Sequence, residues 1–232
     1  SFAGKYLIET NGRYDGSSKF PKDSRFGFFP SVSAGWRVSE EAFMKPLTSV
    51  LSNFKLRASW GNIGNQSITP YAYIPGMDAE QAYWTVSGIK VTTLKPAALV
   101  SNSFTWEKVT TVDVGFDLGL FNDVVSLQVD IFKEKRDGIL ITRKTVPVLA
   151  GFSGASIPVG NLGKAENKGI ETALEVKKRV ANGLFYSLRG NFSFARNKII
   201  ENDEPKPKYE YQDARGRRID QTFGLVALGF FK

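Results

Sequence analysis

The stretch TVDVGFDLGLFNDVVSLQVDI, residues 111–131, carries the clearest pattern in the chain. Every second residue is apolar over 112–120 and again over 125–131, and the positions between them are polar or glycine. Successive side chains of a strand point to opposite faces, so this period of two predicts two strands, each with one apolar and one polar face. Residues 121–123 leave room only for a tight turn, and the two strands are expected to pair as an antiparallel hairpin.

Five further segments show the same period, at about residues 5–14, 26–38, 55–61, 170–177 and 186–194. The compact connections are residues 39–53, 121–123 and 181–183, the long ones are 62–103, 137–168 and 197 onward, and the connection 15–25 is of medium length. Short turns at one end of the strands and long loops at the other are typical of outer-membrane barrels. The predicted fold class is therefore all-β, a partial antiparallel transmembrane β-barrel with about seven strands of a larger barrel.

Two soluble architectures share some of these features. A β-sandwich carbohydrate-binding module also has alternating strands, because one face meets the core and the other meets water. Its strands are usually about 5–6 residues long, and a loop of the length of 62–103 is uncommon in a compact domain. A secreted adhesin built on an open sheet is a further alternative.

No run of eighteen apolar residues occurs, which excludes a helical membrane span.

The composition argues against catalysis and against nucleic acid. The 232 residues include no His and no Cys, which removes histidine triads, cysteine nucleophiles and most zinc sites. We therefore predict no enzyme, no metal and no cofactor. The net charge of +8 is spread over all segments. A local group of Arg215, Arg217 and Arg218 falls in an expected external loop, where it would be solvated or touch anionic lipopolysaccharide rather than bind nucleic acid.

Longer strings allow a comparison with known families, and five blocks carry a specific match. They are RYDGSSKF (13–20), FGFFPSVSAGWRVSEEAFM (26–44), FKLRASWGNIGNQSI (54–68), TWEKVTTVDVGFDLGLFND (105–123) and NLGKAENKGIETALE (161–175). Together they resemble the SusC-like (RagA-like) TonB-dependent transporters of the Bacteroidetes outer membrane. The resemblance implies energised import of oligosaccharides, or in some members of peptides. It also implies TonB and a SusD-like surface lipoprotein as partners.

Strand number suggests that residues 1–232 are one part of such a barrel. Seven is odd and below the minimum of eight for a closed bacterial barrel, and an open edge in lipid would leave backbone groups without partners. Against the family pattern, we expect the plug domain and the C-terminal strands to be absent from this chain.

The barrel interpretation assigns a direction to each face. The apolar positions would face outer-membrane lipid, with Trp36, Trp60 and Trp106 in the interfacial aromatic girdles. The polar positions would face the lumen and pair with one another, with the protein's own plug domain or with solute. The predicted lumen-facing residues are Arg37, Arg57, Asp113, Asp117, Asp130, Glu171 and Arg189, together with Lys55, Glu175 and Lys177.

The long connection 62–103 holds candidate glycan or peptide contacts. They are Tyr71, Tyr73, Tyr83, Trp84, Asn65 and Gln66. Aromatic faces stack on sugar rings while amides bond hydroxyl groups, although the same aromatics could simply pack the loop.

In the compact connection 39–53, Ser39 is expected to cap one short helix, and Pro46 is expected to limit the length of that helix.

Overall fold

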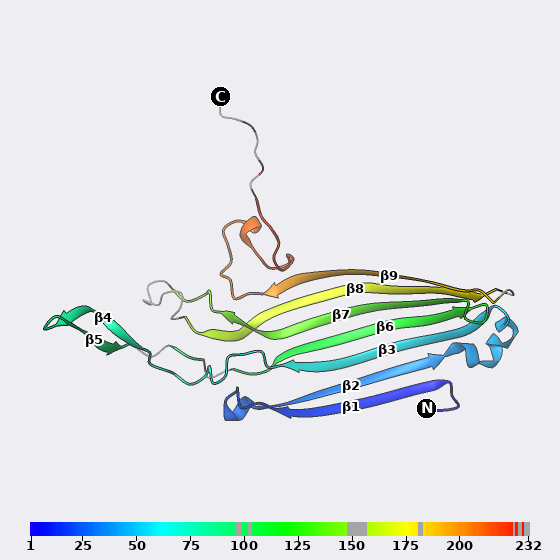
Figure 1. Ribbon diagram of the computed structural model, residues 1–232, viewed down its shortest axis with the longest axis horizontal. Coiled ribbons are helices and arrows are strands. Elements are labelled where there is room, and N and C mark those ends of the chain that lie inside the picture. The colour runs from blue at the N-terminus through cyan, green and yellow to red at the C-terminus, as the bar shows by residue number, and fades with distance from the viewer. Residues whose placement is uncertain are drawn as a thin grey trace.

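The computed structural model describes residues 1–95, 99–101, 104–147, 157–180, 183–224, 226 and 229. Its main element is one sheet of seven antiparallel strands in the order β1-β2-β3-β6-β7-β8-β9 (Figure 1). The strands are β1 (Tyr6–Gly16), β2 (Phe26–Arg37), β3 (Leu51–Asn65), β6 (Glu107–Leu120), β7 (Val125–Thr142), β8 (Val159–Arg179) and β9 (Phe185–Glu201). All seven predicted strands are present, and β1 and β9 are the two edges of an open, curved sheet.

The remaining described elements are small. A hairpin of β4 (Ala79–Val86) and β5 (Ile89–Leu94) lies within the long connection and forms a second sheet beyond the ends of the main strands (Figure 1). The 3-10 turns within the described residues are η1 (Lys22–Ser24), η2 (Val38–Glu40), η3 (Ala42–Leu47) and η6 (Glu210–Gln212). None of the helical segments in the described ranges is long and apolar enough to cross a membrane.

Several strands are longer than the side-chain pattern predicts. β7 continues to Thr142 and β8 begins at Val159, although the apolar alternation there is interrupted by charged residues. Their backbones stay paired from Val125↔Val176 to Thr142↔Val159, with register shifts near Ile139. Ladder hydrogen bonds join main-chain groups, so pairing between neighbours continues where one face is no longer apolar.

The register gives the sheet one consistent apolar face. Direct cross-strand partners form a complete row from one edge to the other: Ile8, Ala34, Ala58, Val114, Ile131, Ile170 and Phe194. This row and its apolar neighbours define what we call the apolar face. Its side chains remain open to the surroundings; Ile8 is 74% and Val114 is 55% exposed. No second layer covers this face within the described residues, so the arrangement is not a sandwich.

A small core forms where β2 and β3 part, beyond their last paired residues Ser31 and Gly61. Its buried members are Phe20, Phe29, Phe104 and Trp106. The Trp106 indole N–H donates to the carbonyl of Arg25 at 3.2 Å. The prediction that Trp106 lies in an interfacial girdle is therefore wrong, because this ring packs against loop aromatics at the long-loop end of the sheet.

The compact connection between β2 and β3 also differs from the prediction. It contains the two turns η2 and η3 rather than one helix, and Ser39 lies inside η2 instead of capping it. Glu41 precedes η3, and its carboxylate accepts bonds from Tyr6 Oη at 2.7 Å, Lys5 Nζ at 3.0 Å and Trp36 Nε1 at 3.1 Å. This carboxylate thus joins the connection to the first two strands.

The tight turn between β6 and β7 is confirmed. Phe121, Asn122 and Asp123 all have positive φ, between 55° and 61°, and the Val124 N–H donates to the Phe121 carbonyl. Ser52 Oγ donates to Asp123 Oδ1 at 2.8 Å and ties the turn to β3. Of the other tight connection, residues 181–182 lie outside the described residues.

Candidate functional site: the polar face of the sheet

The second face of the sheet carries the predicted lumen residues, and we call it the polar face. The register places Arg57, Gly115, Asp130, Glu171 and Ser193 in one row of direct partners on β3, β6, β7, β8 and β9. Other predicted residues occupy neighbouring rows of this face: Arg37, Lys55, Asp113, Asp117, Glu175 and Arg189. Residues scattered over some 150 positions are thereby brought to one surface.

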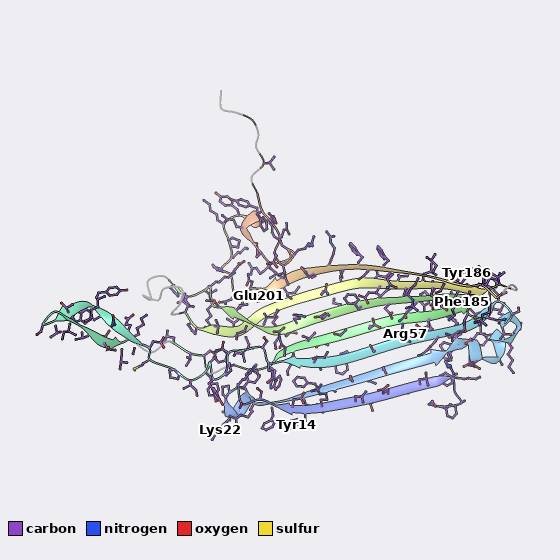
Figure 2. All side chains as sticks on the ribbon, viewed as in Figure 1. Tyr14, Lys22, Arg57, Phe185, Tyr186 and Glu201 are labelled. Carbon is purple, nitrogen blue, oxygen red and sulfur yellow. The ribbon has the colours of Figure 1, made fainter. Side chains whose placement is uncertain are left out.

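Arg57 is the centre of the most extensive charge network on the polar face, and Figure 2 labels it on β3. Its Nη2 lies 2.8 Å from Asp130 Oδ1, and its Nε donates to Asp117 Oδ1 at 3.1 Å. Gln128 adds a bond from Nε2 to Asp130 Oδ2 at 3.2 Å. The Arg57 side chain is 26% exposed, so this charge-assisted pairing is partly shielded from solvent.

Gly115 leaves the space through which the Arg57 side chain contacts Asp130 across β6. It lies between Arg57 and Asp130 in the row, and a Cβ at this position would collide with the Asp130 carboxylate and the Val129 carbonyl. The absence of a side chain on β6 lets the guanidinium pass over this strand to β7. Sequence reasoning missed this role, although a glycine between aspartates on the polar positions of a strand was a visible signal.

Charges elsewhere on the polar face are paired less completely. Arg189 Nη2 lies 3.0 Å from Glu175 Oε1 across β8 and β9, and Ser193 Oγ donates to Glu171 Oε1 at 3.3 Å. The side chains of Arg37, Lys55 and Asp113 make no hydrogen bond or ion pair with any other described residue. Three of the predicted lumen residues are therefore available to groups outside this sheet.

Two of the open hollows on the polar face are lined by predicted lumen residues. One of about 440 Å³ is bordered by Glu9, Ser33, Lys55, Arg57 and Asp113, and one of about 510 Å³ by Asn53, Asp117, Gln128, Lys177 and Arg189. Their walls are mainly polar. Within the described residues no three His, Cys, Asp or Glu side chains form a group that could hold a metal ion.

The six candidate residues of the long connection fall into three separate groups. Asn65 is the last residue of β3 and Gln66 follows it, and the Asn65 amide donates to Glu107 Oε2 at 3.2 Å. Tyr71 and Tyr73 have ring centroids 6.5 Å apart, and Tyr73 packs against the core of Phe20 and Trp106.

Tyr83 and Trp84 belong to the β4–β5 hairpin, which sequence reasoning missed. They are 97% and 59% exposed, and they lie in the irregular part of β4, between Gln81 and Thr85, where the register with β5 shifts. The structure does not bring the six side chains into one pocket, because the hairpin stands apart from the end of the main sheet (Figure 1).

A long single-layered antiparallel sheet, apolar and uncovered on one face and polar with paired charges on the other, defines a section of transmembrane β-barrel wall. Residues 1–227 match the family model described as TonB dependent receptor-like, beta-barrel, and the chain belongs to this family. Proteins of the family are outer-membrane proteins, and this chain is one.

Individual relatives agree with this assignment. The chain is 35% identical over 204 residues to the TonB-dependent receptor SusC of Bacteroides thetaiotaomicron, an alignment that covers 87% of this chain and 20% of SusC. It is 33% identical over 201 residues to the TonB-dependent receptor P26 of Formosa agariphila, with 87% and 20% covered. The chain spans about a fifth of the length of these curated relatives, which are receptors rather than enzymes.

Solved structures support the fold. The RagAB peptide importer in its open-open state superposes with a TM-score of 0.76 at 22% identity, covering 94% of this chain and 23% of the importer chain. The described strands are thus a barrel segment that is not closed on itself. The soluble carbohydrate-binding module has no support, and family membership also favours the barrel over a secreted adhesin.

Proposed function

We propose that this chain forms part of the barrel wall of a transporter that imports oligosaccharides across the outer membrane with energy delivered through TonB. The observation that carries the proposal is the division of one sheet into an uncovered apolar face and a polar face with the Arg57 network. Lipid would contact the first face and the solute pathway would run along the second.

The polar face is proposed to line the lumen and to receive a plug domain. The two hollows lined by predicted lumen residues are open, and Arg37, Lys55 and Asp113 have side chains without an ion-pair partner in the described sheet. Charged groups of a plug could complete these pairs, and a rigid wall of paired charges such as Arg57 with Asp130 would give it a defined seat. The plug and further strands would belong to parts of the protein outside residues 1–232.

The long loops are proposed to contact the solute. Tyr83 and Trp84 offer large exposed aromatic surfaces on a hairpin beyond the sheet, and Tyr71 adds a half-exposed ring near the end of β3. Aromatic surfaces of this kind suit sugar rings, with Asn65 and Gln66 as amides nearby in the chain. Peptide is the second candidate solute, because the RagAB neighbour is named as a peptide importer.

The partners proposed for the whole protein follow from the SusC-like family. They are TonB on the periplasmic side and a SusD-like lipoprotein at the cell surface. The hairpin β4–β5 and the segment around η6 lie at the long-loop end of the sheet, where a surface lipoprotein would meet the barrel (Figure 1).

The test is uptake of labelled oligosaccharides and labelled peptides by cells that lack the gene and are complemented with the full-length protein. We expect uptake of an oligosaccharide class that stops when a protonophore collapses the proton gradient. A Tyr83→Ala, Trp84→Ala double variant should lower uptake, whereas a Phe185→Ala, Tyr186→Ala variant at the short-turn end of β9, also an adjacent exposed aromatic pair, serves as the matched control. Uptake of peptides alone would exclude the oligosaccharide, and uptake that survives the protonophore would contradict TonB-dependent import.

A further inference from the structure

Cationic side chains interrupt the apolar face at the long-loop end of β7, β8 and β9. Lys133, Lys168 and Arg196 are direct partners across the three strands, immediately beyond the apolar row that contains Ile131, Ile170 and Phe194. The next row on the same face contains Lys135, Glu166 and Lys198. We call these six residues the cationic patch. Its residues lie on hydrogen-bonded strands, so their backbone positions are set by the ladder.

The cationic patch is not neutralised from within the chain. Glu166 is its one carboxylate, and it lies 3.0 Å from Lys133 Nζ and 3.3 Å from Lys198 Nζ. The side chains of Lys168, Arg196 and Lys135 make no ion pair or hydrogen bond with any other described residue. Like charges directly opposite each other destabilise a sheet pair, so five cations around one carboxylate are unfavourable unless a further anion joins them.

The cationic patch lies at a height on the sheet that corresponds to the outer edge of the membrane. Lys133 lies eight positions after Val125, which begins β7 at the short-turn end. That separation is about 26 Å along the strand, and somewhat less across the membrane because barrel strands tilt, so it is comparable to the height of a barrel's apolar band. Ile131 and Phe194 are 60% and 54% exposed directly beside the patch. An amphipathic anion would find charge and apolar surface side by side.

A hollow of about 330 Å³ extends the patch toward the segment 216–221. Lys168, Arg196, Lys198 and Arg218 line it, together with Glu166 and Arg217. The segment is held on the edge of β9, because Gly216 N–H donates to the Ile199 carbonyl at 2.7 Å and Ile199 N–H donates to the Arg217 carbonyl at 2.8 Å. The Arg217 guanidinium donates to the carbonyls of Asp213 and Glu210, whereas the exposed Arg218 side chain makes no such bond. Arg218 adds a further free cation to the hollow.

We propose that the cationic patch binds the phosphorylated headgroup of an anionic lipid in the outer leaflet, with the lipid's acyl chains against Ile131, Ile170 and Phe194. This inference rests on the proposed function, which directs the apolar face toward lipid and the long loops toward the exterior. A lipid would contact both the cations of the patch and the adjoining apolar row. Free phosphate would use only the cations, and an acidic polypeptide would leave the adjoining apolar row without a partner.

The experiment compares two lysines of the same strand and the same face. The full-length protein, reconstituted in phosphatidylcholine nanodiscs, is titrated with fluorescent lipopolysaccharide. Lys168→Gln should weaken binding about fivefold, and the triple variant Lys133→Gln, Lys168→Gln, Arg196→Gln on the order of a hundredfold, as expected for cations at an anionic lipid surface. Lys178→Gln is the matched control, since Lys178 is an exposed lysine at the short-turn end of β8.

Three outcomes would overturn the inference. Equal affinity of the Lys168 and Lys178 variants would exclude the patch, and unchanged binding of dephosphorylated lipopolysaccharide would exclude phosphate recognition. Competition by inorganic phosphate at concentrations similar to the lipid would identify a free-anion site instead. Failure of the proposed function has a separate signature: a Val114→Cys side chain in the central apolar row, labelled by aqueous but not by membrane-soluble maleimides, would show that this face does not meet lipid.

Discussion

The two faces of the sheet differ in where their charged side chains lie and in how these are paired. On the polar face, cations meet carboxylates of neighbouring strands, as Arg57 does with Asp117 and Asp130. On the apolar face, charges are absent from the central rows, and at the long-loop end Lys133, Lys168 and Arg196 are direct neighbours. Glu166 of the next row pairs with Lys133, and Lys168 and Arg196 have no ion pair with any other described residue. One backbone ladder therefore supports a polar face whose central cation, Arg57, is paired with two carboxylates, and an apolar face whose cations gather at one end around the single carboxylate of Glu166.

This contrast indicates which substitutions each face tolerates. A charge placed on the polar face can find water or an opposite charge nearby, whereas a charge in the middle of the apolar face would be transferred into hydrocarbon. The side chains around each position, more than the backbone geometry, therefore determine how much an introduced charge lowers the free energy of unfolding. Four predictions test the contrast, in order of decreasing effect.

The largest effect is expected for Val114→Arg in the central row of the apolar face. Arginine at mid-membrane depth should lower the free energy of unfolding by about 2–4 kcal/mol. The measurement is urea unfolding of the full-length protein in lipid vesicles, followed by tryptophan fluorescence. Gln128→Arg is the control on the polar face, where Asp117 and Asp130 lie nearby. Equal destabilisation by the two arginines would mean that the faces are wrongly assigned.

The next effect concerns the strand that Arg57 crosses. Gly115→Ala should cost about 1–3 kcal/mol, because the added methyl group overlaps the Asp130 carboxylate and forces the ion pair apart. Gly190→Ala on β9 provides the comparison, since nothing lies within 4 Å of a Cβ at that position. Both variants are measured by the same unfolding assay, and a harmless Gly115→Ala would show that the Arg57 network adjusts freely.

A smaller loss is expected when the centre of the network is removed. Arg57→Gln leaves Asp117 and Asp130 without their shared cation, and should cost about 1–2 kcal/mol because the side chains are only partly shielded from water. Adding Asp130→Asn should restore part of this loss by removing one of the two unpaired carboxylates. If the double variant is less stable than Arg57→Gln alone, repulsion between the aspartates does not explain the loss.

The smallest effect is a pH dependence at the short-turn end. The Tyr6 hydroxyl, Lys5 and Trp36 donate to Glu41 and lower the pKa of its carboxyl from 4.5 to about 2. A lowered folded-state pKa contributes stability that is complete above about pH 4.5 and is lost as the pH falls toward 2. Thermal unfolding between these pH values should therefore decline less steeply for Glu41→Gln than for the parent protein, and identical slopes would contradict this role of Glu41.

The sequence was sufficient to predict the seven strands and which residues share a face. Alternation at Val112 to Leu120 or at Val125 to Ile131 is a local property, because neighbouring side chains in any strand point to opposite sides. The sequence was not sufficient to predict the hairpin β4–β5, whose segments lack a consistent apolar parity. It was also not sufficient to predict the burial of Trp106, which packs with Phe20 and Phe29 from distant parts of the chain. Whether the six loop residues and the polar face contact solute stays a prediction.

By itself, the sequence determined the period of the strands, the polarity of each face and the turn between β6 and β7, because all three depend on residues next to one another in the chain. The tertiary structure decided which residues became cross-strand partners: that Arg57 meets Asp130 over Gly115, and that Lys133, Lys168 and Arg196 form one row. Register depends on ladder pairing between strands far apart in sequence, and no local pattern of charges contains that information.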